Sequence, residues 1–237
     1  MKANSTLLPF ASFERRSVPL VDFHMHTTWT DGKHSVQQMY DAAVAAGLSY
    51  ILYSEHARRS SGHWFPGFAA EVRALPTGPC KAFVGVESKI ADFDGSLDLS
   101  NDIRQCCDLV MGSVHRFPGE IGIEKGRPPP LSLDEVTDTE FRLARAAGRT
   151  GAIDILGHPF GMTYRRFSMA PSEHLIEELV CECAKHGVAF EVNARYHDDP
   201  WRLIDLCRRH DAAVALGSNA HHRDEVGAIT RMLRDKP

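Results

Sequence analysis

Six cysteines are present and none of them forms a CxxC pair, which excludes zinc-ribbon and thioredoxin-type motifs. No apolar run approaches the roughly 18 residues of a membrane span, and residues 1–18 lack the continuous apolar core of a signal peptide. The formal net charge is only −4, which argues against a general nucleic-acid or membrane-surface binder. These absences predict a cytoplasmic protein with reduced thiols and without a membrane partner. They leave its oligomeric state open.

No internal repeat, linker or low-complexity segment divides the 237 residues. A chain of this length fits one large domain. We therefore expect an N-terminal extension over residues 1–18 and a single domain over residues 19–237. Cys183 and Cys207 occupy apolar positions of helical patterns, and we expect both to be buried thiols.

Apolar runs alternate with helical patterns along the chain. The runs that read as strands buried on both faces are 82–86, 109–114, 153–157, 188–192 and 212–217. Helices are expected from Ser35 to Gly47, from Ser172 to Gly187, and over 132–147, 199–210 and 223–235. Residues 57–67 and 116–131 are expected to form loops. The alternation predicts a parallel α/β fold, either a barrel or a doubly wound sheet.

A side chain of a metal-ligating type follows each strand-like run. These side chains are His24 and His26, Glu55 and His56, Glu87, His115, His158, Asn193, and Asn219 with His221. In a barrel of parallel strands the C-terminal strand ends meet at one face, where chemistry takes place. A lone histidine at a strand end is more often structural than a ligand. The joint pattern, however, predicts a polynuclear metal site.

These residues lie within motifs that follow a recognisable order. The motifs are Asp22-Phe23-His24-Met25-His26-Thr27-Thr28 with Thr30-Asp31-Gly32, Ser54-Glu55-His56, Gly85-Val86-Glu87, Ser113-Val114-His115, Gly157-His158-Pro159 and Gly217-Ser218-Asn219-Ala220-His221. The chain resembles the polymerase and histidinol phosphatase (PHP) family of metal-dependent phosphoesterases from residue 20 to residue 222. The resemblance implies a distorted (β/α)7 TIM-like barrel, two or three divalent ions (zinc, manganese or iron), and hydrolysis of a phosphate ester.

The resemblance also implies three ligand sets. One ion is expected on His24, His26, Glu87 and Asn219, a second on Glu87, His115 and His158, and a third on Asp31, His56 and His221. His34 is a weaker alternative to Asp31. The family usually has aspartate at the positions of Asn219 and Glu55. Asn219 leaves the first site one negative charge poorer, whereas Glu55 is expected to lie behind the ligands.

The ligand types suit zinc, manganese or iron, because calcium and magnesium favour all-oxygen ligands. If Glu87 bridges two ions, the expected nucleophile is a water activated by the metal, and no protein side chain takes that role. Arginine is the residue that binds phosphate in bidentate geometry. Arg116, Arg166 and Arg195 are therefore expected to bind the substrate phosphate.

We expect a small-molecule phosphomonoesterase, with a histidinol-phosphate-like compound as one possible substrate. The enzyme alternative is a nuclease or nucleotide phosphodiesterase, against which the negative net charge argues. A third interpretation, supported by Asn219, is a catalytically weak barrel that binds metal or phosphate. Two loop features stay open: Trp64, Phe65 and Phe68 form either a lid or ordinary packing, and Arg58 with Arg59 is expected to be a solvated pair.

Overall fold

The computed structural model describes residues 13–119 and 131–235. At its centre is one sheet of seven parallel strands that pair in chain order. The strands are β1 (Val21–Met25), β2 (Tyr50–His56), β3 (Lys81–Lys89), β4 (Leu109–Ser113), β5 (Ile155–Leu156), β6 (Ala189–Asn193) and β7 (Val214–Gly217). Each of the five predicted apolar runs overlaps one of these strands, so the prediction of a parallel sheet is confirmed.

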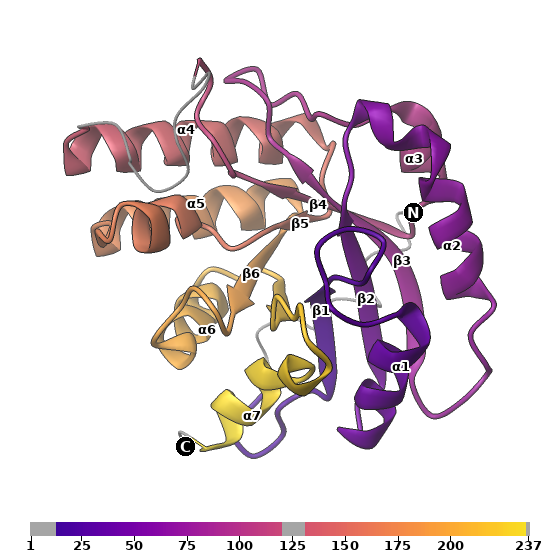
Figure 1. The fold of residues 1–237 in the computed structure, drawn as a ribbon. Helices are drawn as coiled ribbons and strands as arrows, with labels where there is room; N and C mark the ends of the chain where they lie inside the picture. Colours follow the sequence, from indigo (N-terminus) through magenta and orange to yellow (C-terminus); the bar gives the residue numbers. More distant parts are fainter. Residues whose placement is uncertain (1–12, 120–130, 236–237) are drawn as a thin grey trace.

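The two edges of the sheet, β1 and β7, meet and nearly close it into a barrel (Figure 1). The N–H of His26 donates to the carbonyl of Ala220 at 2.8 Å, and the N–H of Ala220 donates to the carbonyl of His24 at 3.1 Å. The buried carboxylate of Asp22 in β1 accepts the N–H of Ser218 at 2.9 Å. These contacts produce a distorted (β/α)7 barrel and exclude the open doubly wound sheet.

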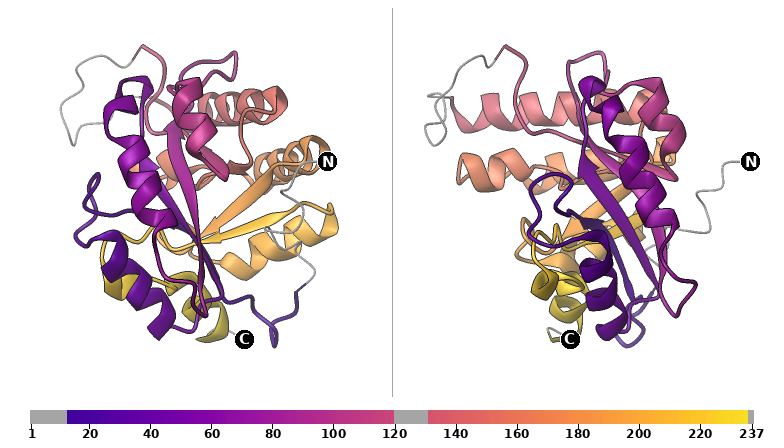
Figure 2. Two further views of the ribbon diagram at one scale, coloured as in Figure 1. Left: turned by 90° about the vertical axis from the view of Figure 1, so that its right-hand side faces the viewer. Right: turned by 45° about the vertical axis from the view of Figure 1, so that its right-hand side comes forward.

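Helices cover the outside of the barrel (Figure 2). In the described part of the chain the α-helices are α1 (Val36–Ala45), α2 (Phe65–Arg73), α3 (Asn101–Cys106), α4 (Leu133–Thr150), α5 (Glu173–His186), α6 (Pro200–Arg209) and α7 (Ala228–Asp235). The predicted caps are present: the Ser35 hydroxyl accepts the N–H of Gln38, and Ser172 begins α5 in the same way. α4 and α5 lie side by side against one side of the barrel.

Two predicted helices have different bounds in the structure. The helix expected over 132–147 continues through Gly148 to Thr150 and ends at Gly151, which adopts a left-handed φ of 67°. Glycine inside a helix costs only about 1 kcal/mol relative to alanine, so Gly148 does not stop α4. The helix expected over 223–235 is divided into a 3-10 turn, Arg223–Glu225, and α7.

The prediction of a loop over residues 57–67 is wrong. A 3-10 turn covers Arg59–His63, and α2 begins at Phe65. Pro66 is compatible with this helix because its first turn needs no donor from that position. Phe65 and Phe68 are fully buried, so they pack in the core and do not form a lid. Of the other predicted loop, residues 120–130 lie outside the described residues, as do residues 1–12 of the expected extension.

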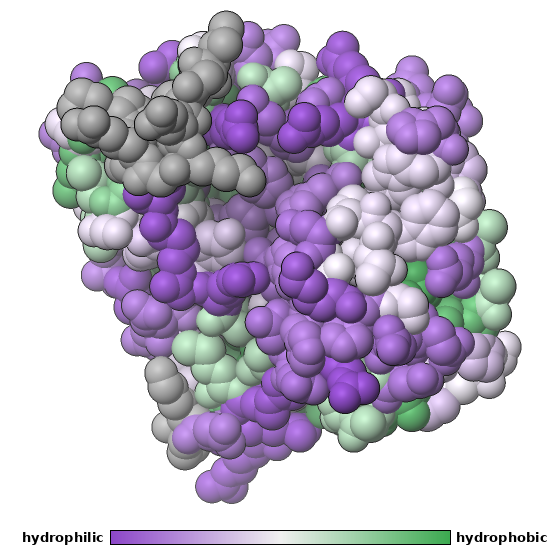
Figure 3. Space-filling view, viewed as in Figure 1, coloured by the Kyte–Doolittle hydropathy of each residue, from purple (hydrophilic) through white to green (hydrophobic). Residues whose placement is uncertain are grey.

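The inside and the outside of the barrel differ as expected for a packed fold. Cys183 and Cys207 are both buried, as predicted. On the face shown in Figure 3, hydrophilic residues dominate and hydrophobic ones gather in small separate areas. None of the helices in the described residues is long and apolar enough to cross a membrane.

Candidate metal centre

The predicted ligands gather at the C-terminal ends of the strands. His24 lies within β1, His56 ends β2 and Glu87 lies within β3. His115 lies two residues after the end of β4, and His158 lies two residues after the end of β5. The barrel thus brings together side chains that are far apart in the chain, as its topology requires.

Glu87 lies at the middle of this group. Five imidazole nitrogens surround its carboxylate. Its Oε1 lies 2.7 Å from His158 Nε2 and 3.0 Å from His115 Nε2, and its Oε2 lies 3.1 Å from His56 Nδ1, 3.3 Å from His24 Nε2 and 3.6 Å from His26 Nε2. A carboxylate with two oxygens directed at different sets of nitrogens has the form of a bridging ligand.

Three overlapping groups of donor atoms have all members within 4.8 Å of one another. They are His24, His26 and Glu87; His56, Glu87 and His115; and His26, Asp31, His56 and His221. The groups resemble the three predicted sets but share more members, because His26 and His56 each belong to two of them. His158 joins through its contact with Glu87 Oε1. The ligand assignment itself stays a prediction.

The centre has a buried floor and an exposed rim. We define the floor as His24, His26, Glu87 and His158, whose side chains are at most 3% exposed. We define the rim as Asp31, His56, His115 and His221, whose side chains are 22–56% exposed. In the rim, Asp31 Oδ2 lies 3.3 Å from His221 Nε2 and 3.6 Å from His56 Nε2.

The charges within the centre lower the pKa values of both Glu87 and His26. Burial raises the pKa of Glu87, but the imidazoles of His115, His24 and His56 outweigh it and hold that pKa well below its usual range. Burial, followed by the charges of His56 and His24, lowers the pKa of His26 well below its ordinary value. A neutral His26 and an ionised Glu87 are the protonation states in which these residues bind metal.

A second layer of hydrogen bonds holds the floor. Glu191 Oε1 lies 2.8 Å from His24 Nδ1 and accepts the side-chain amide of Asn193 at 2.7 Å, while Oε2 accepts the N–H of His158. A carboxylate behind a ligating histidine fixes the orientation of its ring. A Cβ atom at Gly217 would lie 2.0 Å from Glu191 Oε1, so glycine is required where β7 passes this pair.

Asn219 lies just after β7, with its side chain buried. Its φ is 51°, a left-handed conformation that asparagine tolerates better than most residues. Its Oδ1 is buried and has no hydrogen-bond partner among the described residues. A buried carbonyl oxygen without a partner is costly, and a ligand would satisfy it.

Glu55 lies behind the rim, as predicted, and His34 lies apart from it. The Glu55 carboxylate accepts the N–H of Thr27 at 2.7 Å and the hydroxyl of Thr30, so it holds the loop that carries Asp31. Burial raises the pKa of Glu55 to about 7. The ring of His34 contacts that of His222 at 4.3 Å, and none of the three donor groups includes it.

Comparison with known proteins identifies the family. The PHP domain family matches residues 22–195, which include all the floor residues and three of the four rim residues. The chain is a member of the PHP domain family. This establishes the family that the sequence motifs had indicated.

Curated relatives of this PHP domain differ in length and in name. "Probable phosphatase YcdX" of Escherichia coli K12 is 26% identical over 228 residues, which cover 90% of this chain and 83% of the relative. The "DNA polymerase/3'-5' exonuclease PolX" of Bacillus subtilis is 26% identical over 211 residues, or 85% of this chain. That match spans only 34% of the length of PolX.

Solved structures share the fold of this PHP domain. The histidinol phosphate phosphatase of Lactococcus lactis, determined with zinc, L-histidinol and phosphate, has a TM-score of 0.64 and 19% identity. The superposition covers 93% of this chain and 94% of that protein. A structure from Listeria monocytogenes has a TM-score of 0.71 and 15% identity over 87% of this chain and 97% of its own.

The arginines predicted to bind phosphate lie in different places around the PHP centre. Arg195 Nη1 lies 3.2 Å from His221 Nδ1 at the rim, and Arg165 donates to the backbone carbonyl of Arg195. The guanidinium of Arg166 lies 5.8 Å from the ring centroid of Phe167. Arg195 therefore contacts one of the candidate ligands directly.

Arg116 lines a pocket of about 400 Å³ beside the centre. Arg58, which was predicted to be merely solvated, lines the same pocket, as does Lys89 at the end of β3. Sequence reasoning did not assign a role to Lys89. It also missed Glu191, although an acidic residue inside an apolar strand is a signal for a paired or ligating carboxylate.

Proposed function

We propose that this chain is a metal-dependent phosphatase that hydrolyses small phosphomonoesters. The observation that carries the proposal is the arrangement of three overlapping donor groups around Glu87 at the mouth of a PHP-type barrel. The relatives named as phosphatases support the same reaction class.

The side chains fit a set of transition-metal ions. His26 Nδ1 and Asn219 Oδ1 are buried and have no hydrogen-bond partner among the described residues. Groups of this kind are rare in folded proteins unless a ligand or water satisfies them. A mixture of imidazole nitrogen and carboxylate oxygen suits zinc, manganese or iron. We propose His24, His26, Asp31, His56, Glu87, His115, His158, Asn219 and His221 as the ligands.

Bound ions would supply a Lewis acid that activates water and neutralises charge on the phosphoryl group. The protein residues around them have separate tasks. Glu191 holds the ring of His24, and Glu87 connects floor and rim. The exposed rim is where a phosphate can enter, and Arg195 beside His221 is placed to bind its oxygens. Loss of one such charge-assisted contact costs about 1.5–3 kcal/mol.

The proposal can be tested with metal-loaded protein and a panel of phosphoesters. The panel should contain phosphomonoesters, among them histidinol phosphate, together with a phosphodiester and a single-stranded oligonucleotide. We expect turnover of at least one small phosphomonoester. Arg195→Ala should raise its KM while the metal content stays unchanged. Cleavage of the oligonucleotide alone would favour the exonuclease activity named for PolX, and absence of all turnover would favour a barrel that only binds.

A further inference from the structure

The pocket beside the metal centre opens directly onto it. Three members of the centre contribute to its lining: His56, Glu87 and His115. The remaining walls come from the segments that follow β2, β3 and β4. A substrate whose phosphate contacts the rim would therefore extend into this pocket of about 400 Å³.

The outer walls of the pocket are positively charged. Arg58, Lys89 and Arg116 line it from three different strand ends. Two acidic residues line the same pocket, Glu87 of the centre and Asp98. Within the described residues, no hydrogen bond or ion pair involves the charged groups of these three cations. The carboxylate of Asp98 accepts the backbone N–H of Arg59 at 3.3 Å. The cations are therefore available to a ligand.

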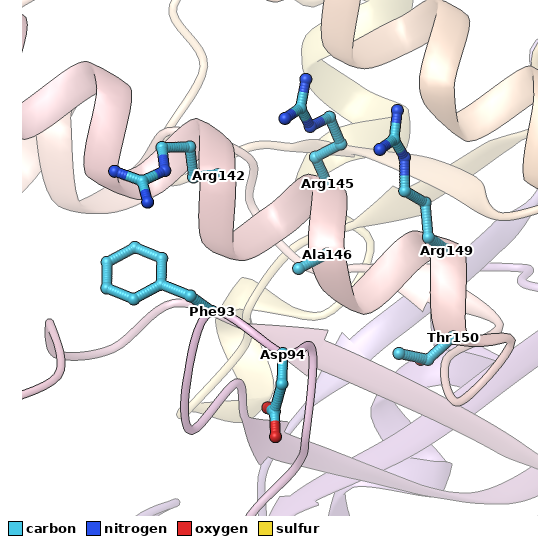
Figure 4. A pocket seen from close by; sticks show the side chains of 7 residues that line it. All are labelled: Phe93, Asp94, Arg142, Arg145, Ala146, Arg149 and Thr150. Carbon is cyan, nitrogen blue, oxygen red and sulfur yellow. The ribbon is translucent and has the colours of Figure 1, made fainter.

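A second hollow shows the opposite arrangement (Figure 4). It also contains three arginines, but Arg142 lies 4.7 Å from the ring centroid of Phe93, and Arg149 forms an ion pair with Glu182 at 2.6 Å. Arg145 and Arg149 point away from the Phe93 loop in Figure 4. Arginines that are stacked or paired in this way are not free to bind an anion. The two hollows thus differ in whether the charged groups of their cations are already engaged.

From these observations we infer that the pocket binds a second anionic group of the substrate. The substrate class is then a small phosphomonoester that also carries a carboxylate or a second phosphate. This inference rests on the proposed phosphatase function. An anion between two arginines and a lysine gains charge-assisted hydrogen bonds, whereas the ammonium group of a compound such as histidinol phosphate would be repelled.

Two cationic sets then divide the recognition of the substrate. Arg195 contacts His221, and neither residue lines the pocket. The pocket cations accompany His56 and His115. We assign the reacting phosphate to the rim beside Arg195 and the second anionic group to Arg58, Lys89 and Arg116.

Phosphonates that cannot be hydrolysed allow a binding test that is independent of turnover. 3-Phosphonopropionate and propylphosphonate have similar shapes, but only the first carries a carboxylate. Propane-1,3-diphosphonate supplies a second phosphonate in its place. Titration calorimetry on the metal-loaded protein should show that at least one of the two bifunctional probes binds about tenfold or more tightly than propylphosphonate, because hydrogen bonds to charged groups contribute on this scale. The favoured probe distinguishes a carboxylate from a second phosphate.

Variants show whether the gain comes from the pocket. Lys89→Met and Arg58→Gln should each bring the affinity ratio most of the way to one. Lys185→Met is the matched control, because Lys185 is exposed near the C-terminal end of α5, at the opposite end of the barrel, and it should keep the ratio. A ratio near one in the wild type, or a high ratio that neither pocket variant lowers, would overturn the inference.

The outcome can be separated from that of the proposed function. Turnover of 3-phosphoglycerate and of glycerol 3-phosphate, which differ in one carboxylate, should show the same preference and the same sensitivity to Lys89→Met. A pocket-dependent binding preference without any hydrolysis would support the anion subsite and contradict the phosphatase proposal. Hydrolysis of both substrates with no preference for the carboxylate would support the phosphatase proposal and contradict the anion subsite. Displacement of 3-phosphonopropionate by a single-stranded oligonucleotide at lower concentration than by any small phosphate would overturn the small-molecule class.

Discussion

The floor and the rim of the centre contain the same kinds of side chain but are built in different ways. The floor is buried, and Glu191 holds its histidines from behind. The rim is open to solvent, and Asp31 contacts His56 and His221 at 3.3–3.6 Å. Buried polar groups must be satisfied by fixed partners, whereas exposed ones can exchange with water. We therefore expect that floor ions are tightly held and that the rim ion exchanges and meets the substrate.

Loss of the Glu87 carboxylate should weaken metal binding at the floor and at the rim together. Its oxygens contact His158 and His24 of the floor and His115 and His56 of the rim. Glu87→Gln keeps the shape and removes the charge. We expect loss of metal from floor and rim together, and a fall in kcat/KM of at least roughly a thousandfold, or about 4 kcal/mol. Metal analysis and kinetics check this against Glu173→Gln, the same change at an exposed site. Unchanged metal content would contradict the bridging role.

Glu140 is a buried carboxylate that lies outside the metal centre. It lies in α4 and accepts the N–H groups of Met162 at 3.1 Å and Thr163 at 2.9 Å. Burial raises the pKa of Glu140 to about 7 from its ordinary 4.5. The folded chain therefore binds this proton more tightly than the unfolded chain does.

This difference makes stability depend on pH. The contribution of Glu140 to the free energy of unfolding is full below about pH 4.5 and is lost as the pH rises through about 7. The loss is at most about 3 kcal/mol. Glu140→Gln should remove that part of the slope, as measured by urea unfolding between pH 5 and pH 8 at fixed metal content. Parallel slopes for wild type and variant would show that Glu140 does not titrate differently in the folded chain.

A substitution at Glu191 tests whether metal binding at the floor depends on the hydrogen bonds that hold His24 and His158 from behind. Glu191→Gln keeps a hydrogen-bonding group beside His24 but removes the charge that orients and polarises the ring. We expect metal affinity at the floor to fall by about 10- to 100-fold, with the rim less affected. Competition with a chromogenic chelator measures this. Equal weakening of all sites would mean that floor and rim are not separately held.

A substitution at Asn219 is expected to give the smallest change in metal affinity, and to raise that affinity where the other substitutions lower it. Asn219→Asp adds a carboxylate at nearly constant volume to a floor that otherwise relies on Glu87. Metal binding at the first site should tighten by about tenfold, or about 1.4 kcal/mol. If neither Asn219→Asp nor His24→Ala changes metal content, the first site is not used in this protein.

Much of the fold and the position of the centre could be predicted from the sequence. The strands are apolar runs that end in ligand-type residues, and parallel topology brings such ends together whatever the intervening helices do. The helix α2 was missed because Pro66 and Gly67 resemble a turn, although both are tolerated in a first helical turn.

The detailed grouping of donors could not be predicted from the sequence. His26 and His56 each take part in two groups because their ring positions depend on the curvature of the barrel, which no local pattern specifies. Lys89 carries no signal of its own, since one lysine at the end of an apolar strand is common. Its place beside Arg58 and Arg116 appears only when three neighbouring strands are paired.

Elemental analysis of protein purified without chelator tests the central claim most directly, since all else depends on Glu87 and its histidines holding metal. The account predicts two or three transition-metal ions per chain. During dialysis against a weak chelator, one ion should leave first. Asp31→Asn should remove that ion selectively. The control His174→Ala, at an exposed helix position, should leave the metal content unchanged. Less than one ion per chain would contradict the account.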